Sequence, residues 1–125
     1  LFERILFLSK IDLFQQVPGI VLSYIADISD EIVMKEGEVI ILDDQQNDYF
    51  YLVVSGNLEL FKGGELVAFY GEGQFIGEMI VKEGFANFNR ARTTRDSLLM
   101  KFDKNQFYEL LSDNVKLADQ FLTYI

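Results

Sequence analysis

The side chains in this chain that could carry chemistry are mainly carboxylates and arginines, because the chain contains neither histidine nor cysteine. Their absence excludes Ser-His-Asp and Cys-His nucleophilic sites, histidine general bases, and almost every zinc or redox centre. Paired carboxylates can still act as acid and base, as in glycoside hydrolysis. No pair of Asp or Glu in the sequence is marked by such a motif or spacing, so we expect a protein that is not an enzyme.

The acidic residues are also too poorly organised to indicate a metal. Asp43, Asp44 and Asp48 are close in the sequence, but they lack the spacing and the terminal Glu of a calcium-binding EF-hand loop. A solvated turn is the favoured interpretation, and we expect no metal site. The charge balance, 20 acidic against 11 basic residues, argues against binding of nucleic acid or of an anionic membrane by this segment.

The segment Gly77–Gly84 is the strongest candidate for a functional element. It is bracketed by glycines, lies between predicted strands, and is long enough for one or two helical turns. A helix that interrupts a β-rich region commonly carries function. Glu78 is then either a ligand-binding residue or a carboxylate that stabilises the N-terminus of this helix through the helix dipole. The residue types alone leave both interpretations open.

The part of the chain that must position this segment reads as short strands. Eight of the nine glycines lie between Gly37 and Gly84, and turn signals recur about every eight to twelve residues, which is typical of a barrel or sandwich. Lys62-Gly63-Gly64-Glu65 predicts a two-residue hairpin turn, because paired glycines permit the positive φ that such turns require. The predicted strands cover residues 32–35, 39–42, 49–54, 58–61, 65–69, 89–94 and 98–102.

Both ends of the chain predict helices. After Pro18, apolar residues recur at helical spacing, and near the other end Asp103 and Gln106 form a capping box, with Phe102 and Phe107 placed as a hydrophobic staple. The helix after Pro18 is expected to use Ile20, Val21, Tyr24, Ile25 and Ile28 as its apolar face. The capped helix is expected to bury Phe107, Leu110 and Leu111. A last helix, capped by Ser112 or Asp113, would align Val115, Ala118, Phe121, Leu122 and Ile125.

The order of these elements resembles that of the cyclic nucleotide-binding domain family over essentially the whole chain. Gly37-Glu38-Val39-Ile40 looks like the family's opening strand signal. Asp48-Tyr49-Phe50-Tyr51-Leu52-Val53-Val54-Ser55-Gly56 looks like its central strand, in which aromatic residues predict burial on both faces. Gly71-Glu72-Gly73-Gln74-Phe75-Ile76-Gly77-Glu78-Met79 is similar to the loop that opens its phosphate-binding cassette.

The resemblance implies a mainly β fold, a jelly-roll β-barrel (double-stranded β-helix) flanked by N- and C-terminal helices. A short helix is inserted in the cassette. We expect one domain over residues 1–125, with helices in about 1–28, the β-roll in about 29–102 and C-terminal helices in about 103–125. We interpret the chain as a fragment of a longer protein.

The resemblance also implies a ligand site. In the family the cassette binds the cyclic phosphate and the ribose, and its short helix directs backbone N–H groups at the anion. Glu78 occupies the place of the Glu that accepts the ribose 2′-hydroxyl. The family's phosphate-binding Arg follows about ten residues after the cassette glycine, and counting from Gly77 places Asn87 there. The implied binding residues are Phe75, Ile76, Gly77, Glu78, Met79, Asn87 and Phe88.

Asn87 removes the positive charge of that site, and Phe88 stands where the family has a small residue, Ser or Thr. Arg90 and Arg92 are expected to point outward from a strand and so not to replace the missing cation. The alternative is a rearranged cassette that brings Arg90 inward. Phe85 and Phe88 either stack on a purine or pack in the core, and with 12 Phe in the chain core packing is favoured.

These observations predict a cytoplasmic, non-catalytic regulatory or sensor domain whose binding of cAMP or cGMP is weakened or lost. The alternatives are a ligand-free interaction or structural module on the same fold, or a sensor of a different small ligand. We expect no cofactor. The expected partner is an attached effector domain of the parent protein, which includes the case of a membrane protein with this domain on its cytoplasmic side. A homodimer through the C-terminal helix stays open.

Overall fold

The structure is a computed structural model that describes residues 2–11, 14–15, 17–42, 49–76 and 88–114 of the 125-residue chain. The predictions for the inserted helix after Gly77 and for the last helix from Val115 fall outside the described residues. The described helices are α1 (Phe2–Ser9), α2 (Gly19–Asp27) and α3 (Lys104–Asp113). The described strands are β1 (Ser29–Met34), β2 (Val39–Ile41), β3 (Tyr49–Ser55), β4 (Asn57–Lys62), β5 (Glu65–Gly71), β6 (Phe75–Ile76), β7 (Arg90–Thr93) and β8 (Ser97–Asp103).

The strands form two antiparallel sheets, sheet A in the order β1-β8-β3-β6 and sheet B in the order β2-β7-β4-β5. Their pairing is nested: β1 pairs with β8, β2 with β7, β3 with β6 and β4 with β5. A long hairpin that rolls up on itself gives this pattern, which is that of a jelly roll. The predicted mainly β jelly roll with flanking helices is therefore confirmed.

The innermost hairpin has the predicted turn. Gly63 and Gly64 have φ of 59° and 84°, and Lys62 pairs with Glu65 across the turn. Positive φ at both central residues is the requirement of the type I′ turn, which matches the twist of the strands it joins. Two glycines satisfy that requirement without steric cost.

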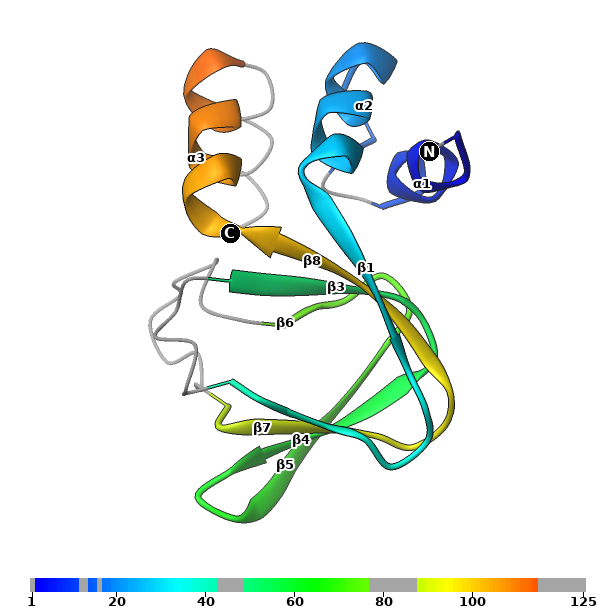
Figure 1. Ribbon diagram of the computed structural model, residues 1–125, viewed down its shortest axis with the longest axis vertical. Helices are drawn as coiled ribbons and strands as arrows, with labels where there is room; N and C mark the ends of the chain where they lie inside the picture. Colours follow the sequence, from blue (N-terminus) through cyan, green and yellow to red (C-terminus); the bar gives the residue numbers. More distant parts are fainter. Residues whose placement is uncertain (1, 12–13, 16, 43–48, 77–87, 115–125) are drawn as a thin grey trace.

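The molecule has three layers, with the helices at one end, sheet A in the middle and sheet B at the other end (Figure 1). Two apolar clusters separate the layers. The helix-side core, between the helices and sheet A, includes Leu8, Phe14, Ile25, Phe50, Leu52, Met100, Phe102 and Phe107. The inner core, between the two sheets, contains Met34, Tyr51, Val53, Leu58, Leu60, Ile76, Ala91 and Leu99.

Strand β3 is buried on both faces, as the aromatic run predicted. Successive side chains of a strand point to opposite faces, so Phe50 and Leu52 join the helix-side core while Tyr51 and Val53 join the inner core. All four are at most 2% exposed. Sheet A is therefore the central layer, and its central strands β8 and β3 carry apolar side chains on both faces.

The buried face of α2 differs from the predicted face. Val21 and Ile25 are buried, but Ile20 and Tyr24 are 62% and 45% exposed, and Leu22 and Ala26 are buried instead. The sequence of α2 is apolar on most sides, so two overlapping stripes of residues have helical spacing. Packing against the helix-side core selects between these stripes, and periodicity alone does not contain that information.

The start of α3 has the predicted geometry. The Asp103 carboxylate accepts a hydrogen bond from the backbone N–H of Gln106 at 3.0 Å. The rings of Phe102 and Phe107 are 6.0 Å apart in an edge-to-face arrangement, and Phe107 is fully buried. Leu110 and Leu111 are half-buried and pack on the helix-side core. This staple and cap fix the position of α3 directly after β8.

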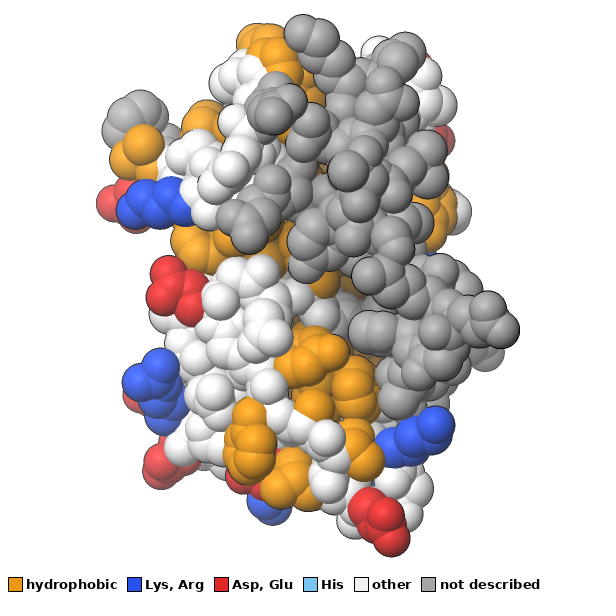
Figure 2. Space-filling view, turned by 180° about the vertical axis from the view of Figure 1, so that it is seen from behind, with side chains coloured by type: hydrophobic (Ala, Val, Ile, Leu, Met, Phe, Trp, Pro, Cys, Tyr) orange, Lys and Arg blue, Asp and Glu red, His pale blue; other side chains and the backbone are white. Residues whose placement is uncertain are grey.

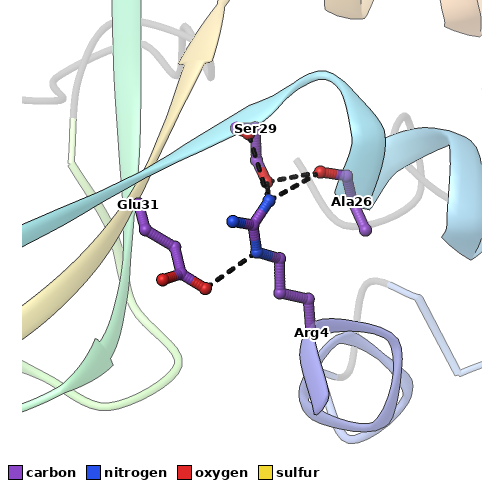
Figure 3. A network of polar contacts seen from close by, with 4 residues as sticks. All are labelled: Arg4, Ala26, Ser29 and Glu31. Carbon is purple, nitrogen blue, oxygen red and sulfur yellow. Dashed lines mark hydrogen bonds and ion pairs between the residues drawn. The ribbon is translucent and has the colours of Figure 1, made fainter. Parts of the chain in front are cut away.

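A single arginine joins the first helix to the sheet (Figure 3). The Nε of Arg4 donates to Oε1 of Glu31 at 2.8 Å. Its Nη1 donates to the carbonyl oxygens of Ser29 and Ala26 at 3.3 and 3.4 Å. Arg4 lies on α1 while its partners lie at the end of α2 and on β1, so this side chain links all three elements.

Candidate functional site

The candidate site is framed by the two strands on either side of residues 77–87, which themselves lie outside the described residues. β6 ends at Ile76 in sheet A, where it pairs with β3, and β7 begins at Arg90 in sheet B, between β2 and β4. The cassette segment therefore connects one sheet to the other. Of the predicted binding residues, Gly77, Glu78, Met79 and Asn87 lie outside the described residues, and Phe75, Ile76 and Phe88 are described.

The turn before β6 holds the start of the segment in place. The N–H of Gly71 donates to Oε1 of Gln74 at 2.8 Å, and the N–H of Gln74 donates to the carbonyl of Gly71 at 3.1 Å. The N–H of Gly73 donates to the carbonyl of Val53 at 2.8 Å, and Gly73 has a φ of 85°. These bonds fix β6 on the edge of sheet A, although β6 is only two residues long.

Phe75 and Ile76 point to opposite faces of sheet A. Ile76 is 1% exposed and belongs to the inner core. Phe75 packs on the helix-side core, where its ring lies 6.2 Å from that of Phe14 and 6.1 Å from that of Phe50. The beginning of the cassette is thus in direct contact with both apolar clusters.

Phe88 is half-buried at the other end of the segment. It packs against the inner core, and its ring meets that of Tyr70 edge-on, with centroids 5.7 Å apart. Asn89, the next residue, donates its N–H to the carbonyl of Phe61 at 2.8 Å and accepts from the N–H of Leu42 at the same distance. The backbone after the cassette is therefore fixed between β2 and β4. Phe88 therefore packs against the core, as its favoured interpretation predicted.

The two arginines of β7 lie outside the roll. Arg90 and Arg92 are exposed, whereas Ala91 and Thr93 between and after them are buried. Arg92 pairs with Glu59 of β4 at 3.0 Å. The prediction that both arginines point outward is confirmed, and β7 directs no positive charge toward the interior of the roll.

Sequence reasoning missed two residues next to the site, Tyr70 and Phe14. Both contact a predicted site residue but are distant from it in the sequence, so only the pairing of β4 with β5 and the packing of the α1–α2 connection bring them there. The described part of the site is apolar and aromatic. Such surfaces bind a ligand or pack a core; they supply no acid, base or nucleophile.

Among the described stretches, no helix is long and apolar enough to cross a membrane. The same stretches bring no group of three or more Asp or Glu together in a way that could hold a metal ion. Asp43, Asp44 and Asp48 lie outside the described residues.

Comparison with known proteins gives one family match. Residues 31–114 match the family model described as cyclic nucleotide-binding domain. This range begins in β1 and ends just after α3, so it includes all of the roll except the first two residues of β1, together with the segment between β6 and β7.

The chain is also similar to individual curated proteins and to solved structures. The chain is 30% identical over 105 residues to a cAMP-dependent protein kinase regulatory subunit of Hypocrea atroviridis, covering 84% of this chain and 23% of the relative. It is 30% identical over 84 residues to lysophospholipase NTE1 of Phaeosphaeria nodorum, covering 63% of this chain and 6% of the relative. Among solved structures, cAMP-bound PfPKA-R superimposes with a TM-score of 0.74 at 18% identity, over 98% of this chain and 46% of the other. The chain thus spans about a quarter or less of the length of these two curated relatives.

Proposed function

The chain belongs to the cyclic nucleotide-binding domain family, and from this premise we propose that it is a non-catalytic sensor domain in which Asn87 has weakened or abolished the binding of cAMP and cGMP. Glu78 keeps the place of the ribose-binding carboxylate. By the resemblance, Phe75, Ile76, Gly77 and Met79 would be further binding residues of the cassette. The position that would neutralise the phosphate carries an uncharged amide.

The observation that carries this proposal is the outward direction of Arg90 and Arg92. A shifted register could in principle bring Arg90 into the phosphate site, but Arg90 is exposed on sheet B, where it lies opposite Phe61. The residues of β7 that face inward, Ala91 and Thr93, carry no charge. The nearest arginines along the chain therefore do not compensate for Asn87.

The size of the expected effect follows from the energetics of ion pairs. Removal of one member of a buried charge pair costs about 2–5 kcal/mol, which corresponds to a loss of affinity of roughly 30-fold to several-thousandfold. An amide at position 87 recovers only about 0.5–1.5 kcal/mol through a neutral hydrogen bond. The net charge of −9 adds long-range repulsion of an anionic ligand.

A ligand in the cassette would act on the helices through Phe75. This residue lies in β6 at the beginning of the cassette, and it contacts Phe14 between α1 and α2 as well as Phe50 beneath α3. A shift of β6 is therefore transmitted to the helix-side core, from which an attached domain of the parent protein would sense it. We propose such an effector domain as the partner, with the domain acting in the cytoplasm.

Phe88 favours the alternative function, a ligand-free interaction module on the same fold. Its ring is anchored on Tyr70 and the inner core, at the position where the family has a small residue. In that alternative the roll is a folded scaffold, and the cassette binds no nucleotide.

Calorimetric titration of the purified chain with cAMP and with cGMP tests the proposal. We expect no binding or binding in the high micromolar range or weaker. Low-micromolar or tighter binding of either nucleotide would show that Asn87 does not impair the site. Binding of neither nucleotide, together with unchanged thermal stability at millimolar concentrations, would favour the interaction module.

A further inference from the structure

The outer face of sheet B carries several exposed apolar side chains that the proposed function does not use. Sheet A is covered by the helices on one side and by the inner core on the other, whereas no described element covers the outer side of sheet B (Figure 1). Figure 2 shows hydrophobic side chains gathered over the half of the molecule that contains β4, β5 and β7. The exposed fractions of the apolar side chains on its outer strands are 50% for Val39, 42% for Ile41, 46% for Leu66 and 59% for Phe69.

Strand register arranges this face as two rows across the four strands. Residues directly opposite each other in neighbouring strands share a face, so the pairing places an arginine of β7 in each row. The first row consists of Val39, Arg92, Glu59 and Phe69. The second row consists of Ile41, Arg90, Phe61 and Leu66.

The two arginines differ in how their charge is compensated. Arg92 pairs with Glu59 at 3.0 Å, and its guanidinium lies 5.3 Å from the ring centre of Phe61. In the second row Phe61 takes the place that Glu59 has in the first. The side chain of Arg90 is exposed and makes no hydrogen bond or ion pair with another described residue. Among the described residues, Arg90 is therefore a cation without an acidic partner, and its neighbours in the row are apolar.

A cavity of about 530 Å³ lies beside this cation, lined by Val39, Phe61, Gly63, Gly64, Asn89, Arg90 and Arg92. Its volume is in the range of ligand-binding clefts. The Oδ1 of Asn89 accepts from the N–H of Gly63 at 2.7 Å, which holds the β4–β5 hairpin against the start of β7. A Cβ added to Gly63 or Gly64 would meet no atom within 4 Å, so a ligand can approach the backbone there.

We propose that this face docks a segment of a partner protein that carries an acidic side chain among apolar ones. The carboxylate would pair with Arg90, and the apolar neighbours would cover Val39, Phe61 and Phe69. Four strands at a spacing of about 4.8 Å span roughly 14 Å, the length of four to five extended residues. A free small anion could pair with Arg90 but would leave the outer apolar side chains in water. The positive charge of Arg90 and the exposed apolar surface around it together favour a peptide segment.

A phage-displayed library of random twelve-residue peptides is the probe. Selection on the wild-type chain, followed by removal of clones that bind the Arg90→Glu variant, should enrich peptides in which Asp or Glu is flanked by Leu, Ile, Phe or Tyr. Enrichment of peptides without acidic residues, or no enrichment, would overturn the proposal.

Fluorescence anisotropy with a selected peptide then tests the face residue by residue. Arg90→Glu should weaken binding at least about tenfold, as expected for loss of a charge-assisted contact. The matched control Arg95→Glu makes the same change in net charge at an exposed residue between β7 and β8 and should alter affinity less than about twofold. Phe69→Ser should weaken binding, whereas Val33→Ser, at an exposed position of sheet A, should not. Equal effects of Arg90→Glu and Arg95→Glu would show binding by net charge alone and contradict the proposal.

Two further experimental results would show that something other than a partner segment occupies this face. Sedimentation that shows a dimer of the chain, dissociated by Phe69→Ser, would identify a second copy on this face and overturn the proposal. Displacement of the peptide by inorganic phosphate, beyond that by chloride at equal ionic strength, would identify a small-anion site and overturn it as well. The proposal gives Asn87 no role in binding the peptide, so Asn87→Arg should leave peptide affinity unchanged, which separates this test from that of the nucleotide site.

Discussion

Phe88 packs edge-on against Tyr70, with ring centroids 5.7 Å apart and ring planes at 80°. This contact anchors the residue that directly follows Asn87. Both rings pack against the inner core, so Phe88 belongs to the structural framework of the roll.

We predict that Phe88→Ala lowers the free energy of unfolding by about 1–3 kcal/mol, less than the loss for a fully buried Phe because Phe88 is half-buried. Urea denaturation measures the change. The matched control is Phe69→Ala on β5, whose side chain is 59% exposed and should cost less than about 0.5 kcal/mol. Equal losses in the two variants would show that Phe88 is not a core residue.

Arg4 should be irreplaceable by lysine. Its guanidinium reaches Glu31 with one nitrogen and two backbone carbonyls with another, and an ammonium group cannot reproduce this fork. We predict that Arg4→Lys destabilises the chain by about 1 kcal/mol and speeds hydrogen exchange in α1. The control Arg95→Lys should change neither, and protection of α1 equal to wild type in Arg4→Lys would contradict this role.

Gly56 should tolerate no side chain. It has a φ of 103°, and an added Cβ would lie 2.7 Å from the Cα of Ser97 on the neighbouring strand β8. Gly56→Ala should cost about 3 kcal/mol or more, through strain and overpacking. Gly19→Ala, at the start of α2 with open space around it, should be neutral or stabilising by up to about 1 kcal/mol. Thermal denaturation of both variants measures these changes in stability. A smaller loss of stability in Gly56→Ala than in Gly19→Ala would refute the steric argument.

The fold could be predicted where local chemistry determines the structure. The Gly63-Gly64 turn, the Asp103 cap and the double-sided burial of Phe50 and Tyr51 each follow from residue types a few positions apart. β6 was not predicted, because two residues carry no periodicity and the strand exists only through its pairing with β3. The prediction of the buried face of α2 was wrong for a related reason, because tertiary packing determines which of two apolar stripes is buried.

The candidate site was predictable as a motif and not as a set of contacts. The glycines and Glu78 mark its position in the chain, and strand alternation places Arg90 and Arg92 outside the roll. The aromatic neighbours Tyr70 and Phe14 belong to segments distant in the sequence, so no local pattern predicts that they contact the site. The placement of Arg90 opposite Phe61 depends on the register of β7 against β4, which the sequence pattern does not specify.

The most direct test of the central claim is the affinity for cAMP of four proteins: wild type, Asn87→Arg, Phe88→Ser and the double variant, measured by calorimetry with cGMP in parallel. Restoring the cation and a small neighbour should strengthen binding by roughly 30-fold or more in the double variant, while Phe88→Ser alone should gain little. A double variant that binds no better than wild type, while remaining folded, would contradict the claim that Asn87 is the reason for weak nucleotide binding.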